Sequence, residues 1–196
     1  MLTPALTPTP RNRRQEALLL KHGLHKTVDL MHAMTYDANG GHHSPMELAV
    51  DAVGKARAAG LPMHQVTIGL PFYGRNSVSG DWVTYEDLVQ RHAPLDPALD
   101  RLPVPGGPAD AFIGLNGRAT IAAKTQLAVQ EGLGGVMIWE AGQDCRMVPV
   151  THGDKTHGVT CPEGERSSLL VAMREAWVRA RSPVEAAGED VSSSDL

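Results

Sequence analysis

Aromatic and charged side chains stand together at three points of the sequence, each at the end of a short apolar stretch. In chain order these residues are Tyr36 with Asp37, Tyr73 with Arg75, and Trp139 with Glu140. Aromatic faces beside hydrogen-bonding groups suit a sugar, because the C–H face of a sugar ring packs on a π-surface while its hydroxyls need donors and acceptors. A carboxylate pair such as Asp37 and Glu140 is also what acid and base work on a glycosidic bond requires. The alternative is that the aromatic side chains belong to the core, which is our interpretation of the neighbouring Phe72.

Three strands are needed to bring these residues to one place. Apolar stretches rich in β-branched residues predict strands over residues 28–37, 66–75 and 134–140. Helical patterns predict helices over residues 44–60, 118–130 and 167–179. This order, with no hairpin signal between the main strands, predicts an α/β fold with parallel strands. The functional residues of such folds gather at the carboxyl ends of the strands, so we expect the three pairs to share one rim.

Two local patterns complete this outline. Ser44-Pro45-Met46-Glu47 has the sequence of a capping box, which predicts that the Ser44 hydroxyl caps the first amide groups of the helix that follows. The stretch from Asn76 to Asp110 is predicted to be an irregular loop insertion that contains one helix, Tyr85 to His92.

A single domain is expected over residues 15–181, starting with a short helix over residues 15–22. Residues 1–14 and the acidic, serine-rich residues 182–196 are predicted to be disordered. The composition, with 42% hydrophobic and 20% charged residues, is that of a globular protein with a core.

Charge and hydropathy argue against two classes of partner. The formal net charge of −4 provides no basic surface for a phosphate backbone, so we expect no nucleic acid partner. No stretch approaches the roughly 18 consecutive apolar residues of a membrane span, so we expect no membrane partner. The Pro/Thr-rich start of the chain lacks the pattern of a secretory signal, and the compartment stays open.

Glycines, histidines and cysteines give no cofactor signal. Gly132, Gly134 and Gly135 precede their strand, whereas a phosphate loop follows one. The histidines are interpreted as solvated loop residues without metal-ligand spacing: His42, His43, His152 and His157. We therefore expect neither a cofactor nor a metal. Cys145 and Cys161 flank a polar loop; they either remain free thiols or form a disulfide worth about 3 kcal/mol.

Three stretches of the chain together resemble the glycoside hydrolases of family 18, the chitinase family. Met34–Asp37, Gly69–Arg75 and Gly135–Glu140 are similar to the ends of the sixth, seventh and eighth strands of that family's barrel. The resemblance covers the chain from Val28 to Trp177. It implies a partial TIM (β/α)8 barrel, about the last three to four βα units, and a substrate of β-1,4-linked N-acetylglucosamine oligomers, as in chitin.

The resemblance also implies a role for each residue at the strand ends. Trp139 would form the floor under the sugar at the cleavage point, Tyr36 would donate to the substrate's acetamido group, and Asp37 would help to hold that group. The other residues implied to bind the substrate are Met34, Tyr73, Arg75 and Met137. In this family the acetamido oxygen is the nucleophile, so no second carboxylate nucleophile is needed. Glu140 is then interpreted as a structural or rim group.

One part of the family pattern is missing. The general acid of family 18 is the last residue of an Asp-x-x-Asp-x-Asp-x-Glu motif on the fourth strand, and that spacing does not occur in this chain. Too few residues precede Val28 for four or five βα units, which predicts the C-terminal half of a chitinase barrel. Loss of general acid catalysis costs about 10²- to 10⁴-fold in rate, so we expect no activity from the chain alone.

Two other functions remain open at this point. The first alternative to an inactive chitinase fragment is a non-catalytic binder of chito-oligosaccharides. The second is a truncated product without an independent role, or a half that functions only with a partner. A half barrel leaves two sheet edges unpaired, which predicts self-association or a partner that supplies the missing strands.

Overall fold

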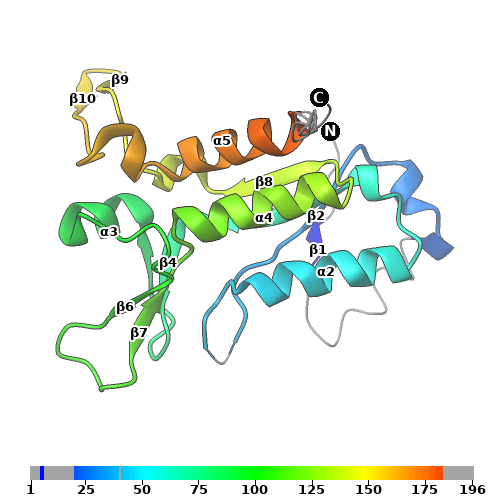
Figure 1. Cartoon of the computed structure of the whole chain (residues 1–196), viewed down its shortest axis with the longest axis horizontal. Helices are drawn as coiled ribbons and strands as arrows, with labels where there is room; N and C mark the ends of the chain where they lie inside the picture. Colours follow the sequence, from blue (N-terminus) through cyan, green and yellow to red (C-terminus); the bar gives the residue numbers. More distant parts are fainter. Residues whose placement is uncertain (1–4, 7–19, 40, 183–196) are drawn as a thin grey trace, which may run out of the picture.

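The computed structural model of the protein describes residues 5–6, 20–39 and 41–182. Their strands form a four-stranded parallel sheet, a four-stranded antiparallel sheet and a two-stranded hairpin. In Figure 1 the antiparallel sheet and the short helix α3 lie at one end of the molecule, beyond the long helices.

The parallel sheet has the strand order β1-β2-β3-β8. Its strands are β1 (Ala5–Leu6), β2 (Met31–Ala33), β3 (Val66–Pro71) and β8 (Gly135–Trp139). Two helices alternate with them, α2 (Met46–Ala58) between β2 and β3 and α4 (Arg118–Gln130) before β8. This alternation confirms the predicted α/β fold with parallel strands.

Helix α5 (Leu169–Arg181) follows β8 and packs against α4, which also contacts α2. Figure 1 shows these three helices side by side, with β8 between α4 and α5 in the view. The predicted bounds of the last helix differ from the observed ones by two residues at each end. Four 3-10 helices complete the described chain: η2 (Leu24–Lys26), η3 (Met63–Gln65), η4 (Ala141–Gln143) and η5 (Gly164–Ser167).

The core lies where α2 and α4 cover the parallel sheet. Every residue of β3 is buried, and Ile68 packs with Met31 of β2 and Ala128 of α4. Helix α2 buries a stripe of small residues, Ala49, Ala52, Val53 and Ala56. Small side chains let a helix pack closely against a sheet.

The insertion between β3 and α4 is a sheet, so the prediction of an irregular loop is wrong. Its strands are β4 (Tyr73–Asn76), β5 (Trp82–Thr84), β6 (Arg101–Pro103) and β7 (Phe112–Gly114), in the order β5-β4-β7-β6. Strands of three or four residues are too short to show an alternating pattern, which explains the error. Helix α3 (Tyr85–His92) lies where it was predicted, capped by the Thr84 hydroxyl, which accepts from the Asp87 amide at 3.1 Å.

The predicted capping box before α2 is also wrong. The helix begins at Met46 after Pro45, with no side-chain cap. The Ser44 hydroxyl is fully buried and donates to the Thr35 carbonyl at 2.6 Å. It also accepts from the Lys124 ammonium at 2.7 Å, so a buried cation takes the group that would have capped the helix.

The chain ends differ in how much of them is described. Ala5–Leu6 forms β1 beside β2, within the stretch for which we predicted disorder. The remaining residues of 1–14, the start of the helix predicted over residues 15–22, and residues 183–196 lie outside the described chain. No described helix has the length and apolar character that crossing a membrane requires.

The two cysteines form a disulfide, with Cα atoms 4.9 Å apart. The loop that it closes carries the hairpin of β9 (Val150–His152) and β10 (Lys155–His157). Immediately before the first cysteine, the buried Asp144 accepts from the Ser168 hydroxyl at 2.7 Å and from the Leu170 amide at 2.8 Å. These bonds join the segment after β8 to the start of α5.

Candidate functional site

The carboxyl end of β8, the loop after β2 and the first two strands of the antiparallel sheet line an open hollow of about 380 Å³. It is lined by Asp37, Tyr73, Arg75, Gly80, Trp82, Trp139, Glu140 and Gln143. Ligand pockets have volumes of about 300–1,000 Å³, so this hollow is large enough for a small ligand. The structure thus brings four of the predicted site residues into one wall, while Met34, Tyr36 and Met137 are not among its lining residues.

Asp37 is the centre of the polar side of the hollow. Its Oδ1 atom accepts from the Tyr73 hydroxyl at 2.7 Å and from the Arg75 guanidinium at 3.4 Å. Its backbone has φ 60°, a conformation that few non-glycine residues adopt and that is more frequent at functional sites. The carboxylate is 54% exposed and lines the hollow, and its bonds to Tyr73 and Arg75 are both made by Oδ1.

Tyr73 and Tyr36 form the buried support beneath Asp37. Burial, then the bond to Asp37, raises the pKa of Tyr73 far above its usual value, so the phenol remains a donor. Burial, then the charge of Asp37, raises the pKa of Tyr36 to about 12. The two rings meet edge to face with centroids 6.2 Å apart, and the Tyr36 hydroxyl lies 3.8 Å from the Met137 sulfur.

Gly69 on β3 is required by the position of the Tyr36 ring. A Cβ atom at Gly69 would lie 2.5 Å from Cε1 of Tyr36, closer than any real contact. The absence of a side chain at Gly69 therefore leaves the space in which the Tyr36 ring packs.

His43 lies behind the polar wall, and its interpretation as a solvated loop residue is wrong. Its side chain is 2% exposed and packs with its ring 4.9 Å from the Tyr73 ring and its Nδ1 3.8 Å from Asp37 Oδ1. Burial, then the cations and His42 around it, lowers the pKa of His43 to about 3. His42 is also engaged, with Nε2 2.7 Å from the Leu115 carbonyl oxygen. The sequence contains no spacing that signals this burial.

Trp139 provides the apolar side of the hollow and is 54% exposed. It ends β8 opposite Pro71, its carbonyl accepts from the Phe72 amide at 2.9 Å, and its peptide bond to Glu140 is cis. Glu140 is exposed and accepts from Gln143 at 3.3 Å, so it lies on the rim. Phe72 is fully buried, as predicted.

Trp82 also lines the hollow, and the sequence analysis missed it. This residue begins β5, directly opposite Arg75 of β4, and is 64% exposed. It was missed because its position depends on the hairpin between β4 and β5. The Asn-Ser-Val-Ser-Gly-Asp run before Trp82 was the only available turn signal.

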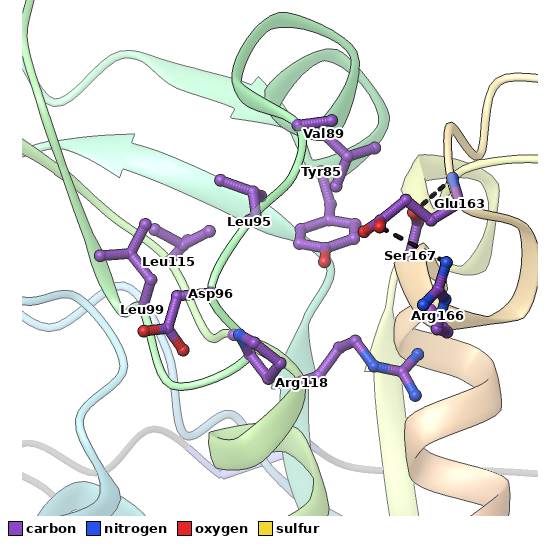
Figure 2. A pocket seen from close by; sticks show the side chains of 13 residues that line it. Tyr85, Val89, Leu95, Asp96, Leu99, Leu115, Arg118, Glu163, Arg166 and Ser167 are labelled. Atoms are coloured by element: carbon purple, nitrogen blue, oxygen red, sulfur yellow. Dashed lines mark hydrogen bonds and ion pairs between the residues drawn. The ribbon is translucent and has the colours of Figure 1, made fainter.

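A second hollow lies between α3 and the start of α4 and cannot hold a sugar. Its volume is about 10 Å³, room for about one water molecule. Figure 2 shows it beside the Tyr85 ring, with Leu95 and Leu115 on one side and the Glu163–Arg166 ion pair on the other. Among the described residues, no group of three or more His, Cys, Asp or Glu side chains is arranged to hold a metal ion.

Ligands of α/β folds bind outside the carboxyl ends of the strands, which is where this chain carries an exposed indole and a hydrogen-bonded carboxylate. The family model for glycosyl hydrolases family 18 matches residues 2–144. The chain therefore belongs to glycosyl hydrolase family 18.

Two curated relatives are chitinases of Streptomyces. Chitinase 63 of Streptomyces plicatus and chitinase C of Streptomyces lividans are each 29% identical over 154 residues. The match covers 61% of this chain and 25% of each relative, so the chain spans about a quarter of the length of these proteins.

Solved structures share the fold over most of this chain. The family 18 chitinase ChiB of Flavobacterium johnsoniae has a TM-score of 0.62 at 26% identity, covering 91% of this chain and 50% of that one. Catalytic domain 2 of the Ostrinia furnacalis group II chitinase has a TM-score of 0.66 at 16% identity, covering 93% and 56%. The chitinase-like agglutinin of Robinia pseudoacacia has a TM-score of 0.62 at 19% identity, covering 90% and 55%.

Proposed function

We propose that the chain binds β-1,4-linked N-acetylglucosamine oligomers in the hollow at the sheet rim. The observation that carries this proposal is the exposed Trp139 in the same hollow as the Asp37–Tyr73–Arg75 cluster. An indole face suits the C–H face of a sugar, and the cluster offers both donors and an acceptor to its hydroxyls. Both curated relatives are named chitinases, which supports chitin as the substrate class.

The fold of this proposed site is the C-terminal part of a (β/α)8 barrel. Support comes from the parallel order of β2, β3 and β8 and from neighbours of which the chain covers 50% and 56%. We propose that the remaining strands come from a partner or from a second copy. The sheet edge at β8 favours this, because β3 is buried throughout while β8 is half-buried or exposed along its whole length.

Each predicted site residue has a place in this proposal. Trp139 stacks under the sugar, and Oδ2 of Asp37 accepts from a sugar hydroxyl or from the acetamido N–H. Tyr36 turns its hydroxyl from the Met137 sulfur, a weak acceptor, to the acetamido oxygen. Tyr73 and Arg75 hold Asp37 in place and bind neighbouring hydroxyls. Met34 and Met137 do not line the hollow as it stands, and we propose that they come into contact with the sugar only when the ligand is bound.

Catalysis by the chain alone is not part of the proposal. In substrate-assisted hydrolysis the acetamido oxygen attacks the anomeric carbon, while a protein acid gives a proton to the leaving oxygen. The carboxylates among the lining residues are Asp37, which bonds Tyr73, and Glu140, which bonds Gln143. The resemblance assigns the role of the family's general acid to neither of these residues. Loss of general acid catalysis lowers the rate of hydrolysis by about 10²- to 10⁴-fold.

The first prediction tests binding and turnover together. Titration with chitotetraose in a calorimeter should give saturable binding, which Trp139→Ala should weaken at least about tenfold by removing the stacking face. Trp177→Ala is the matched control, because Trp177 lies on α5 and lines a different hollow. A fluorogenic chito-oligosaccharide should not be hydrolysed. Turnover that Glu140→Gln abolishes would contradict the proposal, since it would place the acid in this chain.

The same experiment separates the two other functions. Binding that persists without turnover when a complementary half barrel is added favours a non-catalytic binder of chito-oligosaccharides. An aggregated sample without binding favours a truncated product.

A further inference from the structure

A polar hollow adjoins the hollow at the rim and differs from it in composition. Its volume is about 230 Å³, and it lies between the loop after β2 and the turn that joins β4 to β5. The two hollows share Arg75 and Gly80. None of the described residues that line the polar hollow is acidic, and none has a phenyl or indole ring. It therefore lacks the flat apolar face on which a sugar ring stacks.

His43 lines the polar hollow with a buried imidazole. The side chain is 2% exposed, and neither ring nitrogen has a hydrogen-bond partner among the described residues. Asp37 Oδ1, 3.8 Å from Nδ1, and the Tyr73 backbone lie near the ring but outside hydrogen-bond geometry. Buried polar groups in native proteins are almost always hydrogen-bonded, so this ring points to a ligand in the hollow. A neutral imidazole offers that ligand one N–H donor.

Arg75 gives the polar hollow a positive charge and spare donors. Its Nε–H donates to the Gly80 carbonyl at 3.0 Å, and its Nη1 atom donates to Asp37 Oδ1 at 3.4 Å. The second bond is long, and the same oxygen also accepts from Tyr73. A guanidinium has five N–H donors, so most of them have no partner in the described part of the chain.

The turn on the other side of the polar hollow is held by its own hydrogen bonds. Asn76 Oδ1 accepts from the Val78 amide at 2.9 Å and from the Ser79 amide at 3.1 Å. The Ser77 amide donates to the Phe112 carbonyl at 2.8 Å, and the Ser77 hydroxyl oxygen accepts from the Phe112 amide at 3.0 Å. This pairing fixes Ser77, whose hydroxyl proton bonds no described acceptor. A wall fixed in advance lowers the entropic cost of binding.

We propose that the polar hollow is a binding site for a small carboxylate. The guanidinium of Arg75 matches the two oxygens of a carboxylate as a fork, and His43 and Ser77 supply further donors. Donors and one cation, with no acid among the described lining residues, favour an anion over a neutral or cationic ligand. The volume suits a ligand smaller than those of most pockets. This site goes beyond the proposed function, because it needs no sugar.

The second prediction is saturable binding of acetate, the probe for the carboxylate. In NMR titrations of the whole chain at constant ionic strength, acetate should shift the amides of residues 76–80 and the His43 ring protons along one saturation curve. His43→Gln identifies the ring signals, because it removes them. Acetamide has nearly the same shape without the charge, and it should bind at least about tenfold more weakly.

Val78 offers a matched pair of variants for this titration. Its side chain lines the polar hollow and is 67% exposed, and its described hydrogen bond to Asn76 is made by the backbone amide. Val78→Glu places a carboxylate in the hollow with Arg75 and should weaken acetate binding at least about tenfold. Val78→Gln has nearly the same size without the charge and should retain the affinity within about twofold.

A second ligand distinguishes the two sources of a carboxylate, a small free acid and the end of a peptide. N-acetyl-dialanine carries its carboxylate on a peptide chain. Tighter binding than that of acetate assigns the polar hollow to a peptide C-terminus. Equal or weaker binding assigns it to a small free acid.

Three outcomes would overturn the carboxylate site: shifts that do not saturate, equal affinity for acetamide and acetate, or equal losses in the two Val78 variants. These titrations contain no chito-oligosaccharide, so their failure leaves the proposed function standing. Failure of the chain to bind chitotetraose likewise leaves the carboxylate site standing.

Discussion

Asp37 shows how one carboxylate can organise a site. One of its oxygens takes the donors of Tyr73 and Arg75, which come from the second sheet, while the residue itself follows β2 of the first. Asp37 Oδ1 thus links the loop after β2 to two residues of the second sheet, in addition to the chain connection from β3 to β4.

His43 gives the third prediction, on pH. The pKa of His43 is about 3 in the folded protein and 6.5 in an unfolded chain. Between these two pH values the imidazole is therefore protonated in the unfolded state but neutral in the folded state. The free energy of unfolding should therefore fall as the pH drops from 6.5 toward 3, by about 2 kcal/mol at pH 5 from this residue alone. Urea unfolding at pH 7.5, 6 and 5 measures the slope.

The controls for this slope are two substitutions. Between pH 7.5 and pH 5 the free energy of unfolding should fall by about 2 kcal/mol less in His43→Gln than in the unmodified protein, because glutamine does not titrate. His157→Gln, on the exposed strand β10, should show the same decrease in the free energy of unfolding as the unmodified protein. Equal slopes in His43→Gln and the unmodified protein would contradict the prediction.

At the residue scale the sequence predicted which residues lie at strand ends better than it predicted which side chains are buried or share the hollow. Tyr36, Asp37, Tyr73 and Trp139 were found because an apolar stretch that ends in polar residues marks a strand end. The burial of His43 and the contribution of Trp82 depend on contacts between segments far apart in the chain. Local sequence carries no signal for such contacts.

Among the elements, α4 is tied to the loop after β2 by a buried ammonium group. Lys124 is fully buried, and its Nζ donates to the Ser44 carbonyl at 2.8 Å, the Ser44 hydroxyl at 2.7 Å and Asn116 Oδ1 at 2.8 Å. Burial lowers the pKa of Lys124 to about 7. Three acceptors match the three donors of an ammonium group, so these contacts favour the protonated form.

Lys124→Met is the fourth prediction. It removes three buried hydrogen bonds, although the Ser44 carbonyl still accepts from Asn116 Nδ2 and Asn116 Oδ1 still accepts from the Ser44 hydroxyl, and it should lower the free energy of unfolding by about 3 kcal/mol. Chitotetraose affinity should fall as well, because Ser44 bonds the Thr35 carbonyl next to Tyr36. Urea unfolding and calorimetry measure the two effects. Lys155→Met, on the exposed β10, is the matched control and should change neither; an unchanged stability in Lys124→Met would refute the tie.

The helices were easier to predict than the strands. Helix α4 spans the predicted residues 118–130 because Gly132 ends it and a long helical pattern fills it. The second sheet was missed because its strands have three or four residues. The cap of α2 was wrongly predicted because Lys124, distant in sequence, binds the Ser44 hydroxyl.

At the scale of the whole molecule, β8 leaves one edge of the parallel sheet open. In the order β1-β2-β3-β8 it pairs with β3 alone among the described strands. An apolar hollow beside this edge, about 350 Å³ in volume, is lined by Val136, Met173 and Trp177 among others. Unpaired edges and apolar surface favour association with another chain.

Self-association is therefore the fifth prediction. The weight-average mass in sedimentation equilibrium should rise with protein concentration, and Trp177→Lys should reduce the rise by placing a charge beside Arg174. Trp82→Lys, at the rim, should leave the association unchanged. A single monomer mass at all concentrations would show that the open edge is tolerated.

The family of the chain was predictable because three motifs occur in the right order at three strand ends. The position of β1 was not, because two residues without a pattern carry it. The pairing of the cysteines was left open because a spacing does not determine whether two sulfurs meet.

The disulfide between Cys145 and Cys161 makes the stability of a protein sample depend on the compartment in which the chain is produced. Disulfides form in oxidising compartments such as the bacterial periplasm and are rare in the cytosol. The bond lies next to Asp144, whose carboxylate anchors the start of α5, and its loss costs about 3 kcal/mol. Chains made in the cytosol and in the periplasm should therefore differ in their free energy of unfolding by about 3 kcal/mol.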